Sequence, residues 1–366
     1  MSPSAARPSD LPRPTRGALP RRAVLGVSIS STALADQAGD PALRRAIHEE
    51  LLEDLAVHGR LVFTSQAHLD LFVAAVSRLP TSLAKAWEVV LSSRRVQIAL
   101  ARPPLDESLG DILDVALLEA ELADDLELVL LEADHAELLG VGEDQFSAVT
   151  PSGLVEIGRI TTAGRTVALK LARELLDAPL REGVNREVEW TERFGPLCDD
   201  SKPLVVYDKF VGQQTARRYL YGQGTGDGLT WLLTRVAMKP GRRVRIITAI
   251  TDEVDRGQRF DEEAMVAAFH RMLAAMADRD VRVDLVLVPE KVRGTRGGPV
   301  ERFGHDRHLR FGDRVALALG SGVQSFASPT FRETVTVARL PVADAKAREE
   351  RAVKSALRPP PSGWLG

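Results

Sequence analysis

The chain of 366 residues contains a single cysteine, Cys198. One cysteine cannot form an intramolecular disulfide, and it cannot supply the several thiolates of a cysteine-based zinc site. We expect Cys198 to be a small apolar filler, or a surface thiol beside Asp199 and Asp200, and not a nucleophile. The sequence therefore excludes disulfide-stabilised scaffolds and zinc-finger-like modules.

Long hydrophobic runs are also missing. The most apolar stretch, 126-LELVLLEADHAELL, is interrupted by Glu127, Glu132 and Asp134, whereas a membrane-spanning helix needs about 20 apolar residues. We therefore expect no membrane span. Near the N-terminus, Arg21-Arg22 and the small-x-small sequence Ala33-Leu34-Ala35 resemble an export signal. Serines dilute that run, so we favour a buried first strand and a cytoplasmic protein, with export as the alternative.

Aromatic residues make up only 5% of the chain. Around the basic region described below, the candidates for stacking on unpaired bases are Phe303, Phe311, Tyr219 and Tyr221. So few aromatic side chains argue against sequence-specific recognition of single-stranded nucleic acid.

Charge is distributed unevenly along the chain. Residues 181–366 hold 31 Lys and Arg against 25 Asp and Glu, and residues 1–180 hold 17 against 26. A basic half and an acidic half predict different partners, and phosphates are expected on the basic half. Seven cations fall within the 24 residues from 291 to 314. Such a run is either a solvated face or a groove for a polyanion.

The length and the alternation of apolar runs with amphipathic segments predict an α/β protein of two domains. Strands are expected at 24–30, 60–65, 95–100 and 126–133, separated by helices, which indicates a mainly parallel sheet. The predicted parts are a disordered tail at 1–22, an N-terminal α/β domain at 23–142, a connecting segment and helix at 143–180, a second α/β domain at 181–342, and a charged helix with a Pro-rich tail at 343–366.

The order of strands and helices in the first domain loosely resembles the PIN-like group of metal-dependent nucleases. That chemistry needs carboxylates at strand ends, but the first predicted strand ends in Ser28, Ser30 and Ser31. The remaining candidates, Asp36, Asp40, Asp70 and Asp134, have no spacing that brings them together. We therefore expect a regulatory or partner-binding domain without a metal.

Three pieces of the second domain follow one another in a known order. They are the strand and polar triplet 204-LVVYDKFVG, the helix and strand 228-GLTWLLTRV and VRIIT, and 305-HDR before a strand that ends in Gly320-Ser321-Gly322. In this order they resemble the phospholipase-D-like domain of the MIT C-terminal type, which is found in bacterial defence-associated proteins. The resemblance covers about residues 185–340 and implies a phospholipase-D-like α/β fold.

Active members of the resembled family carry His-x-Lys followed by four residues and Asp. Here His305 is present, Arg307 stands at the lysine position, and Gly312 stands at the position of the acid, with Asp313 one residue later. Arginine binds phosphate through a bidentate fork, so the exchange preserves binding. Nucleophilic turnover through His305 is put in doubt. A metal site at His305 and His308 is not expected, because no second ligand cluster is visible.

Tyr207, Asp208 and Lys209 follow a buried strand, at the edge where ligands bind in open α/β sheets. With them, the resemblance implies a site whose catalytic candidates are His305, Asp306, Arg307 and Asp208. Its phosphate-binding candidates are Lys209, Tyr207, His308, Arg310, Arg302 and Lys291.

We expect this degenerate motif to bind a phosphate-bearing ligand, nucleic acid in the first place, without a cofactor. The setting of bacterial defence comes from the resemblance alone. A single phospholipase-D-type half also implies a homodimer that pairs two sites. The alternatives are an active phosphodiesterase, either nuclease or phospholipase, with His305 as nucleophile, and a scaffold subunit of a multi-protein defence complex.

Overall fold

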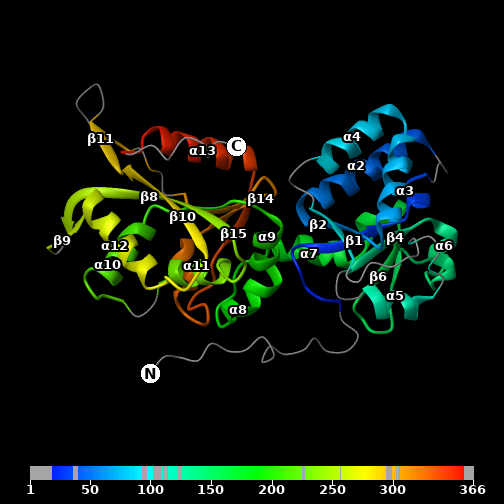
Figure 1. Ribbon diagram of the computed structural model, residues 1–366, viewed down its shortest axis with the longest axis horizontal. Coiled ribbons are helices and arrows are strands. Elements are labelled where there is room, and N and C mark those ends of the chain that lie inside the picture. Colours follow the sequence, from blue (N-terminus) through cyan, green and yellow to red (C-terminus); the bar gives the residue numbers. More distant parts are fainter. Residues whose placement is uncertain are drawn as a thin grey trace. The chain divides into compact units, whose positions relative to one another are not determined.

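The protein is an α/β protein with two mixed sheets (Figure 1). The computed structural model describes residues 19–35, 40–92, 97–101, 109, 112, 114–122, 126–224, 227–255, 257–293, 299–301, 303 and 306–357. The chain separates into two compact units, one built chiefly from residues 25–91 and 98–172 and the other chiefly from residues 173–366. Within the described parts, no helix is long and apolar enough to cross a membrane.

The first unit holds a six-stranded sheet in the order β3-β2-β1-β4-β6-β5. β1 lies parallel to β2 and to β4, β4 lies parallel to β6, and β5 lies antiparallel to β6. The predicted mainly parallel sheet is thus confirmed for these pairs. The strands are β1 (Leu25–Ile29), β2 (Gly59–Phe63), β3 (Gln97–Leu100), β4 (Leu128–Leu131), β5 (Ser147–Val149) and β6 (Glu156–Arg159).

Helices lie on both sides of this sheet (Figure 1). Their starts follow local capping chemistry: the Asp40 carboxylate accepts from Ala42 N at 2.9 Å, and Ser65 Oγ accepts from His68 N at 3.2 Å. The helices are α1 (Ser31–Ala35), α2 (Pro41–His58), α3 (Gln66–Ser77), α4 (Thr81–Ser92), α5 (Val115–Leu122), α6 (Ala133–Leu138), the 3-10 turn η3 (Ile160–Arg165) and α7 (Val167–Asp177), which continues into the second unit.

The segment 143–180 is not the connecting segment that the sequence predicts. Its strands β5 and β6 pair with each other, and β6 pairs with β4, so both belong to the first sheet. The buried Glu156 carboxylate accepts from Val167 N and Ala168 N, which holds the start of α7 against this sheet. Strands of only three and four residues carry too weak an apolar pattern to be recognised.

The second unit holds a sheet in the order β10-β8-β7-β13-β14-β15, with β9 paired to β8. β7 and β10 lie parallel to β8, whereas β13, β14 and β15 run antiparallel to their neighbours. The strands are β7 (Leu204–Tyr207), β8 (Arg242–Asp255), β9 (Gln258–Phe260), β10 (Val281–Pro289), β13 (His308–Phe311), β14 (Val315–Leu319) and β15 (Val337–Leu340). The pair β11 (Lys291–Arg293) and β12 (Pro299–Glu301) is separate.

Two layers of helices cover the second sheet (Figure 1). On one face, α13 packs its Ala352 against a core that contains Val205, Ile247 and Val286. On the other face, Ala216 of α10 and Met265 of α12 belong to a separate cluster. The helices are α8 (Arg186–Glu189), the π-turn η4 (Trp190–Phe194), α9 (Gly195–Asp200), α10 (Val211–Tyr219), α11 (Gly228–Val236), α12 (Glu262–Ala274), the 3-10 turn η5 (Gly322–Ala327) and α13 (Val342–Lys354).

Candidate functional site

The sheet topology brings several segments of the second unit to one edge. β7 runs parallel to β8 and antiparallel to β13, with Tyr207 opposite His308. The end of β7, the start of β13 and the end of β14 therefore meet, and Leu319 N donates to Arg307 O at 3.0 Å. This strand-end corner is where the sequence predicts a ligand site.

Asp208 joins two of these segments. Its carboxylate accepts from Phe210 N at 2.9 Å and from Val323 N at 3.1 Å, and the residue is only 3% exposed. Burial raises the pKa of Asp208 above its ordinary value, although the two backbone N–H groups and the charge of Arg307 oppose the increase. Asp208 thus anchors the turn after β14.

The turn after β14 requires glycine at position 322. The φ of Gly322 is +63°, and a Cβ there would lie 2.0 Å from Asp208 Oδ2 and 2.8 Å from Arg307 Cδ. Only glycine allows both the left-handed backbone and this close approach. Within the motif Gly320-Ser321-Gly322, the third residue is therefore required to be glycine by its packing against Asp208.

Arg307 is the predicted cation that reaches the corner. Its Nη1 donates to Gly320 O at 3.2 Å, and its guanidinium lies over the Phe210 ring, 4.9 Å from the ring centre. The Nε–H is buried, and it has no hydrogen-bond acceptor among the described residues. A buried donor without an acceptor costs about 1–3 kcal/mol, so a ligand oxygen that displaced the covering atoms and accepted from it would be stabilising.

Lys209 already forms an ion pair within the protein. Its Nζ lies 2.9 Å from Glu290 Oε1, and the lysine side chain is 3% exposed. The ammonium also approaches the Phe210 ring from 5.5 Å. Lys209 thus brings positive charge to the corner, but its direct partner is a carboxylate of the protein.

His308 and Arg310 lie on the opposite face of β13, beneath α13. Glu349 of α13 accepts from Arg310 Nη2 at 2.6 Å and from Arg310 Nε at 2.8 Å, and its Oε1 lies 3.1 Å from His308 Nε2. Both residues are buried. This geometry favours a role in holding α13 on the sheet, and the predicted phosphate contacts of His308 and Arg310 gain no support from it.

Tyr207 also packs beneath α13. Its ring is stacked between Phe303 at 4.5 Å and His308 at 4.8 Å. Burial raises the pKa of Tyr207 to about 12, with Asp306 adding to the increase and Arg348 opposing it. Asp306 itself is exposed and is paired with Arg348 at 2.7 Å. The phenol therefore stays protonated at neutral pH.

Three predicted residues remain untested. His305 and Arg302 lie outside the described residues, as does the side chain of Lys291. Of the described candidates, Asp208, Lys209 and Arg307 gather at the corner, while Tyr207, His308 and Arg310 gather beneath α13. The sequence does not reveal the roles of Glu349, Glu290 and Phe210, because each role depends on a contact with a residue that is distant in the chain.

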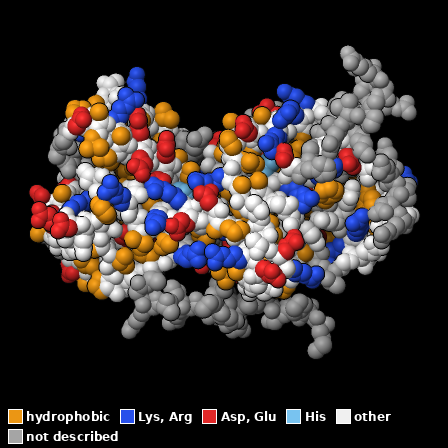
Figure 2. Space-filling view, turned by 180° about the vertical axis from the view of Figure 1, so that it is seen from behind, with side chains coloured by type: hydrophobic (Ala, Val, Ile, Leu, Met, Phe, Trp, Pro, Cys, Tyr) orange, Lys and Arg blue, Asp and Glu red, His pale blue; other side chains and the backbone are white. Residues whose placement is uncertain are grey.

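On the face shown in Figure 2, the described Lys and Arg side chains are interspersed with Asp and Glu. One cation of the run, Arg310, has two acidic neighbours, Glu349 and Asp313. Asp313 also lies 2.7 Å from Lys346 of α13. The evidence for phosphate binding therefore rests on single positions more than on a broad charged surface.

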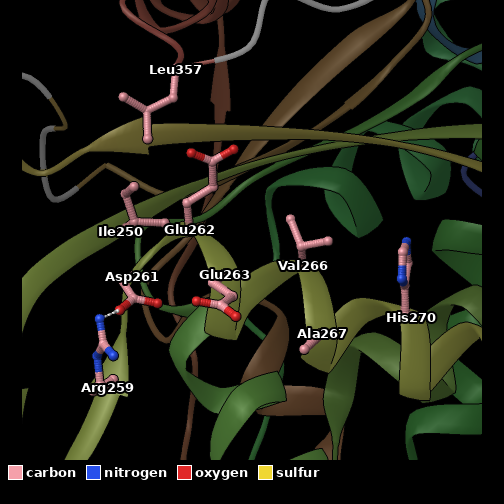
Figure 3. A pocket seen from close by; sticks show the side chains of 9 residues that line it. All are labelled: Ile250, Arg259, Asp261, Glu262, Glu263, Val266, Ala267, His270 and Leu357. Carbon is pink, nitrogen blue, oxygen red and sulfur yellow. Dashed lines mark ion pairs between the residues drawn. The ribbon is translucent and has the colours of Figure 1, made fainter.

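Two hollows open on other parts of the second unit. One, of about 520 Å³, adjoins the corner through Ser321 and is also lined by Gln214, Gln324 and Arg332. The other, of about 630 Å³, lies along α12, where Glu262, Val266 and His270 face Ile250 and Leu357 (Figure 3). The first is the natural extension of the corner, because Ser321 stands between Gly320 and Gly322.

In the first unit, polar side chains meet where β1 and β4 end. Thr32 Oγ1 lies 2.5 Å from Glu132 Oε2 and 2.5 Å from Ser30 Oγ. Asp40 instead caps α2, Asp70 accepts from Gln66, and Asp36 lies outside the described residues. Within the described ranges, no group of three or more His, Cys, Asp or Glu side chains could hold a metal ion.

Cys198 is buried, which confirms the apolar-filler alternative. Burial, together with the negative charge of Asp199, raises the pKa of its thiol well above the ordinary value. A reactive thiolate at neutral pH is thereby excluded.

Comparison with known proteins gives no relative from which a role could be transferred. No protein-family model, no curated protein and no solved structure matches this chain.

Proposed function

We propose that the second unit binds the phosphate groups of nucleic acid at the strand-end corner formed by Asp208, Phe210, Arg307 and the turn 320–322. Arg307 is the central ligand-binding residue. Lys209 adds positive charge without a direct contact, and Asp208 fixes the turn on which Arg307 rests. The domain type and the bacterial defence setting remain proposals that rest on the sequence resemblance.

One observation carries this proposal: the guanidinium of Arg307 contacts two neighbours and keeps one N–H group without an acceptor among the described residues. Phe210 supports its plane, and Gly320 O accepts from Nη1. Its Nε–H has no acceptor among the described residues. A phosphate oxygen accepts such hydrogen bonds well, because the bonds are assisted by charge on both partners. A planar guanidinium on an aromatic ring is a common way to present that fork.

The test measures retention of labelled single-stranded DNA, double-stranded DNA and RNA by the full chain at about 50 mM and about 200 mM salt. We expect retention that weakens with salt, and an Arg307→Gln variant that binds more weakly. Removing one phosphate contact should lower the salt slope by about 1. Arg307→Lys should recover only part of the affinity, because it keeps the charge and loses the fork.

Arg181→Gln is the matched control, because Arg181 is exposed on the second unit and is not part of the corner. Retention that Arg307→Gln and Arg181→Gln reduce equally would contradict a specific site. The absence of retention by the wild-type chain would favour the third reading, a scaffold subunit whose charges serve protein contacts.

A second candidate is phosphodiester cleavage with His305 as nucleophile. The raised pKa of Asp208 supports it, since a buried carboxylic acid of this kind is suited to general acid catalysis. The same labelled substrates test it. Cleavage by the wild type that is lost in His305→Ala would establish an enzyme, whereas unchanged retention in His305→Ala would leave the binding function in place.

A further inference from the structure

β10 forms one edge of the second sheet, and half of its backbone groups point away from the sheet. Glu290 N donates to Ile250 O of β8, while Leu287 O accepts from Leu357 N on the outer side. Backbone polar groups of successive residues alternate between the two sides of a strand. Val281, Val283 and Leu285 therefore turn their polar groups outward, as Leu287 does.

Most of these outward groups are unpaired within the described residues. Val281 N donates to Arg279 O, and Leu357 occupies Leu287 O. The N–H and C=O groups of Val283 and Leu285, and the C=O of Val281, have no partner in the described part of the chain. A long strand edge in this condition is a template for pairing with another strand.

The side chains of the same residues are apolar and partly exposed. Val283, Leu285 and Leu287 line a cavity of about 250 Å³ together with Phe269 and Leu273 of α12. This cavity shares Val266, His270 and Leu357 with the hollow drawn in Figure 3. The edge thus offers backbone groups and an apolar surface at the same place, which are the two requirements for strand addition.

We propose that β10 pairs with β10 of a second copy of this chain, antiparallel, about a two-fold axis at Val283. Leu357 already occupies the edge at Leu287, so the stretch open to a partner runs from Val281 to Leu285, and its middle residue is Val283. In this register the two Val283 residues exchange both of their hydrogen bonds. Leu285 N–H of each copy then donates to Val281 C=O of the other copy.

Charge on the opposite face of β10 favours the same register. Arg282 is exposed, and Asp284 faces the same way, with Arg245 Nε at 2.8 Å. Pairing about Val283 places Arg282 opposite Asp284 of the second copy, twice by symmetry. A shift of the axis by one residue would place Arg282 opposite Arg282, or Asp284 opposite Asp284, which is unfavourable.

A second copy also fits better than the segment of the chain that follows Leu357. If that segment ran along β10, every second residue after Leu357 would have to donate its N–H to β10. The first two of these residues are Pro359 and Pro361. Prolines at these two positions have no N–H and could donate no hydrogen bond to β10. The inference stands apart from the proposed function, because it uses neither Arg307 nor the corner.

Disulfide trapping tests the register in the full chain. In a hydrogen-bonded antiparallel pair the Cα atoms lie about 5.5 Å apart, which suits a disulfide of about 4.4–6.8 Å. Val283→Cys should form a disulfide-linked dimer under mild oxidation by oxidised glutathione, and the only native thiol, Cys198, is buried.

Two cysteine controls make the trapping specific. Arg282→Cys lies on the other face and would meet Asp284 instead of itself, and Ala338→Cys is exposed on β15 at the far edge of the sheet. Both should stay largely monomeric on a non-reducing gel. Failure of Val283→Cys to cross-link, or equal cross-linking by the controls, would overturn the proposal.

Sedimentation equilibrium of unmodified variants provides the second measurement. Val283→Pro removes an outward N–H and no hydrogen bond to β8, so it should give a folded monomer where the wild type is a dimer. Arg282→Asp should weaken the dimer about tenfold. A monomeric wild type, or a dimeric Val283→Pro with the wild-type dissociation constant, would refute pairing through β10.

Discussion

The two faces of β13 use similar side chains for different purposes. His308 and Arg310 point beneath α13, where Glu349 accepts from both and the side chains are buried. Arg307, just before them, points to the other side and lies over Phe210. Strand side chains alternate between faces, so cations adjacent in the sequence separate in the fold. A run of basic residues in the sequence therefore predicts a basic surface only when the strand that holds it and the register of that strand are known.

The largest expected effect comes from breaking the buried contact between Arg310 and Glu349. Glu349→Gln leaves the Arg310 charge buried without its carboxylate and should lower the free energy of unfolding by about 3–5 kcal/mol. Glu350→Gln, at an exposed neighbour on α13, should stay within about 0.5 kcal/mol of the wild type. Urea denaturation measures both, and equal stabilities would show that the buried pair does not hold α13.

The pH dependence of stability sharpens the comparison, because the pKa of Glu349 is lowered by folding whereas the pKa of Asp208 is raised. Burial acts to raise the pKa of Glu349, but hydrogen bonds from Arg310 and His308 outweigh it and leave the pKa below its ordinary value of 4.5. Its stabilising contribution is therefore present above pH 4.5, and it is lost as the pH falls through the lower folded-state pKa. The stability difference between wild type and Glu349→Gln should shrink on acidification.

Asp208 should show the reverse. Its pKa is raised above the ordinary 3.8, chiefly by burial, so its contribution is present below 3.8 and is lost as the pH rises through the higher folded-state pKa. The stability of the wild type relative to Asp208→Asn should therefore fall with rising pH in chemical denaturation series. Parallel curves for the two proteins would contradict the assigned burial of this carboxylate.

A smaller effect is expected at the turn that Asp208 anchors. Gly322→Ala would strain a residue at φ +63° and push a methyl group against the Asp208 carboxylate, which should cost about 1–3 kcal/mol. Gly320→Ala is the natural control, since the nearest atom to its added Cβ lies 3.7 Å away. Thermal unfolding of the two variants should separate them clearly, and indistinguishable melting would refute the close approach.

The smallest effect on stability should come from Arg307, which is only partly buried. Arg307→Gln removes a cation that contacts the Gly320 carbonyl and the face of the Phe210 ring, so the free energy of unfolding should change by no more than about 0.5–1 kcal/mol. Its effect should appear in nucleic-acid retention instead. A variant that lost several kcal/mol of stability and kept full retention would place Arg307 with the structural residues.

The strands and helices that a single sequence can locate share a strong local signal. The run 281-VRVDLVLVPE is apolar and β-branched, and it forms β10. Asp261 precedes an amphipathic segment and caps α12 by accepting from Ala264 N at 3.0 Å. Such elements depend on neighbours within a few residues, which is why a single sequence is enough to find them.

The strand β13 was missed for the opposite reason. Its sequence, His-Leu-Arg-Phe, alternates polar and apolar residues as a half-exposed segment would, yet all four residues are buried. The polar pair is buried because Glu349 faces it, 41 positions after His308. Likewise, Gly322 is explained by Asp208, whose carboxylate accepts from the neighbouring Val323 N across 115 positions. Pairings at this separation leave no mark in local composition.

The burial of Cys198 has a practical consequence for measuring motion. A thiol that solvent cannot reach is modified only during transient opening of the structure around it, so its labelling rate follows the population of the open form when closing is fast. Because the chain has one cysteine and that cysteine belongs to the second unit, the kinetics of a single chemical reaction would report the opening of that unit alone.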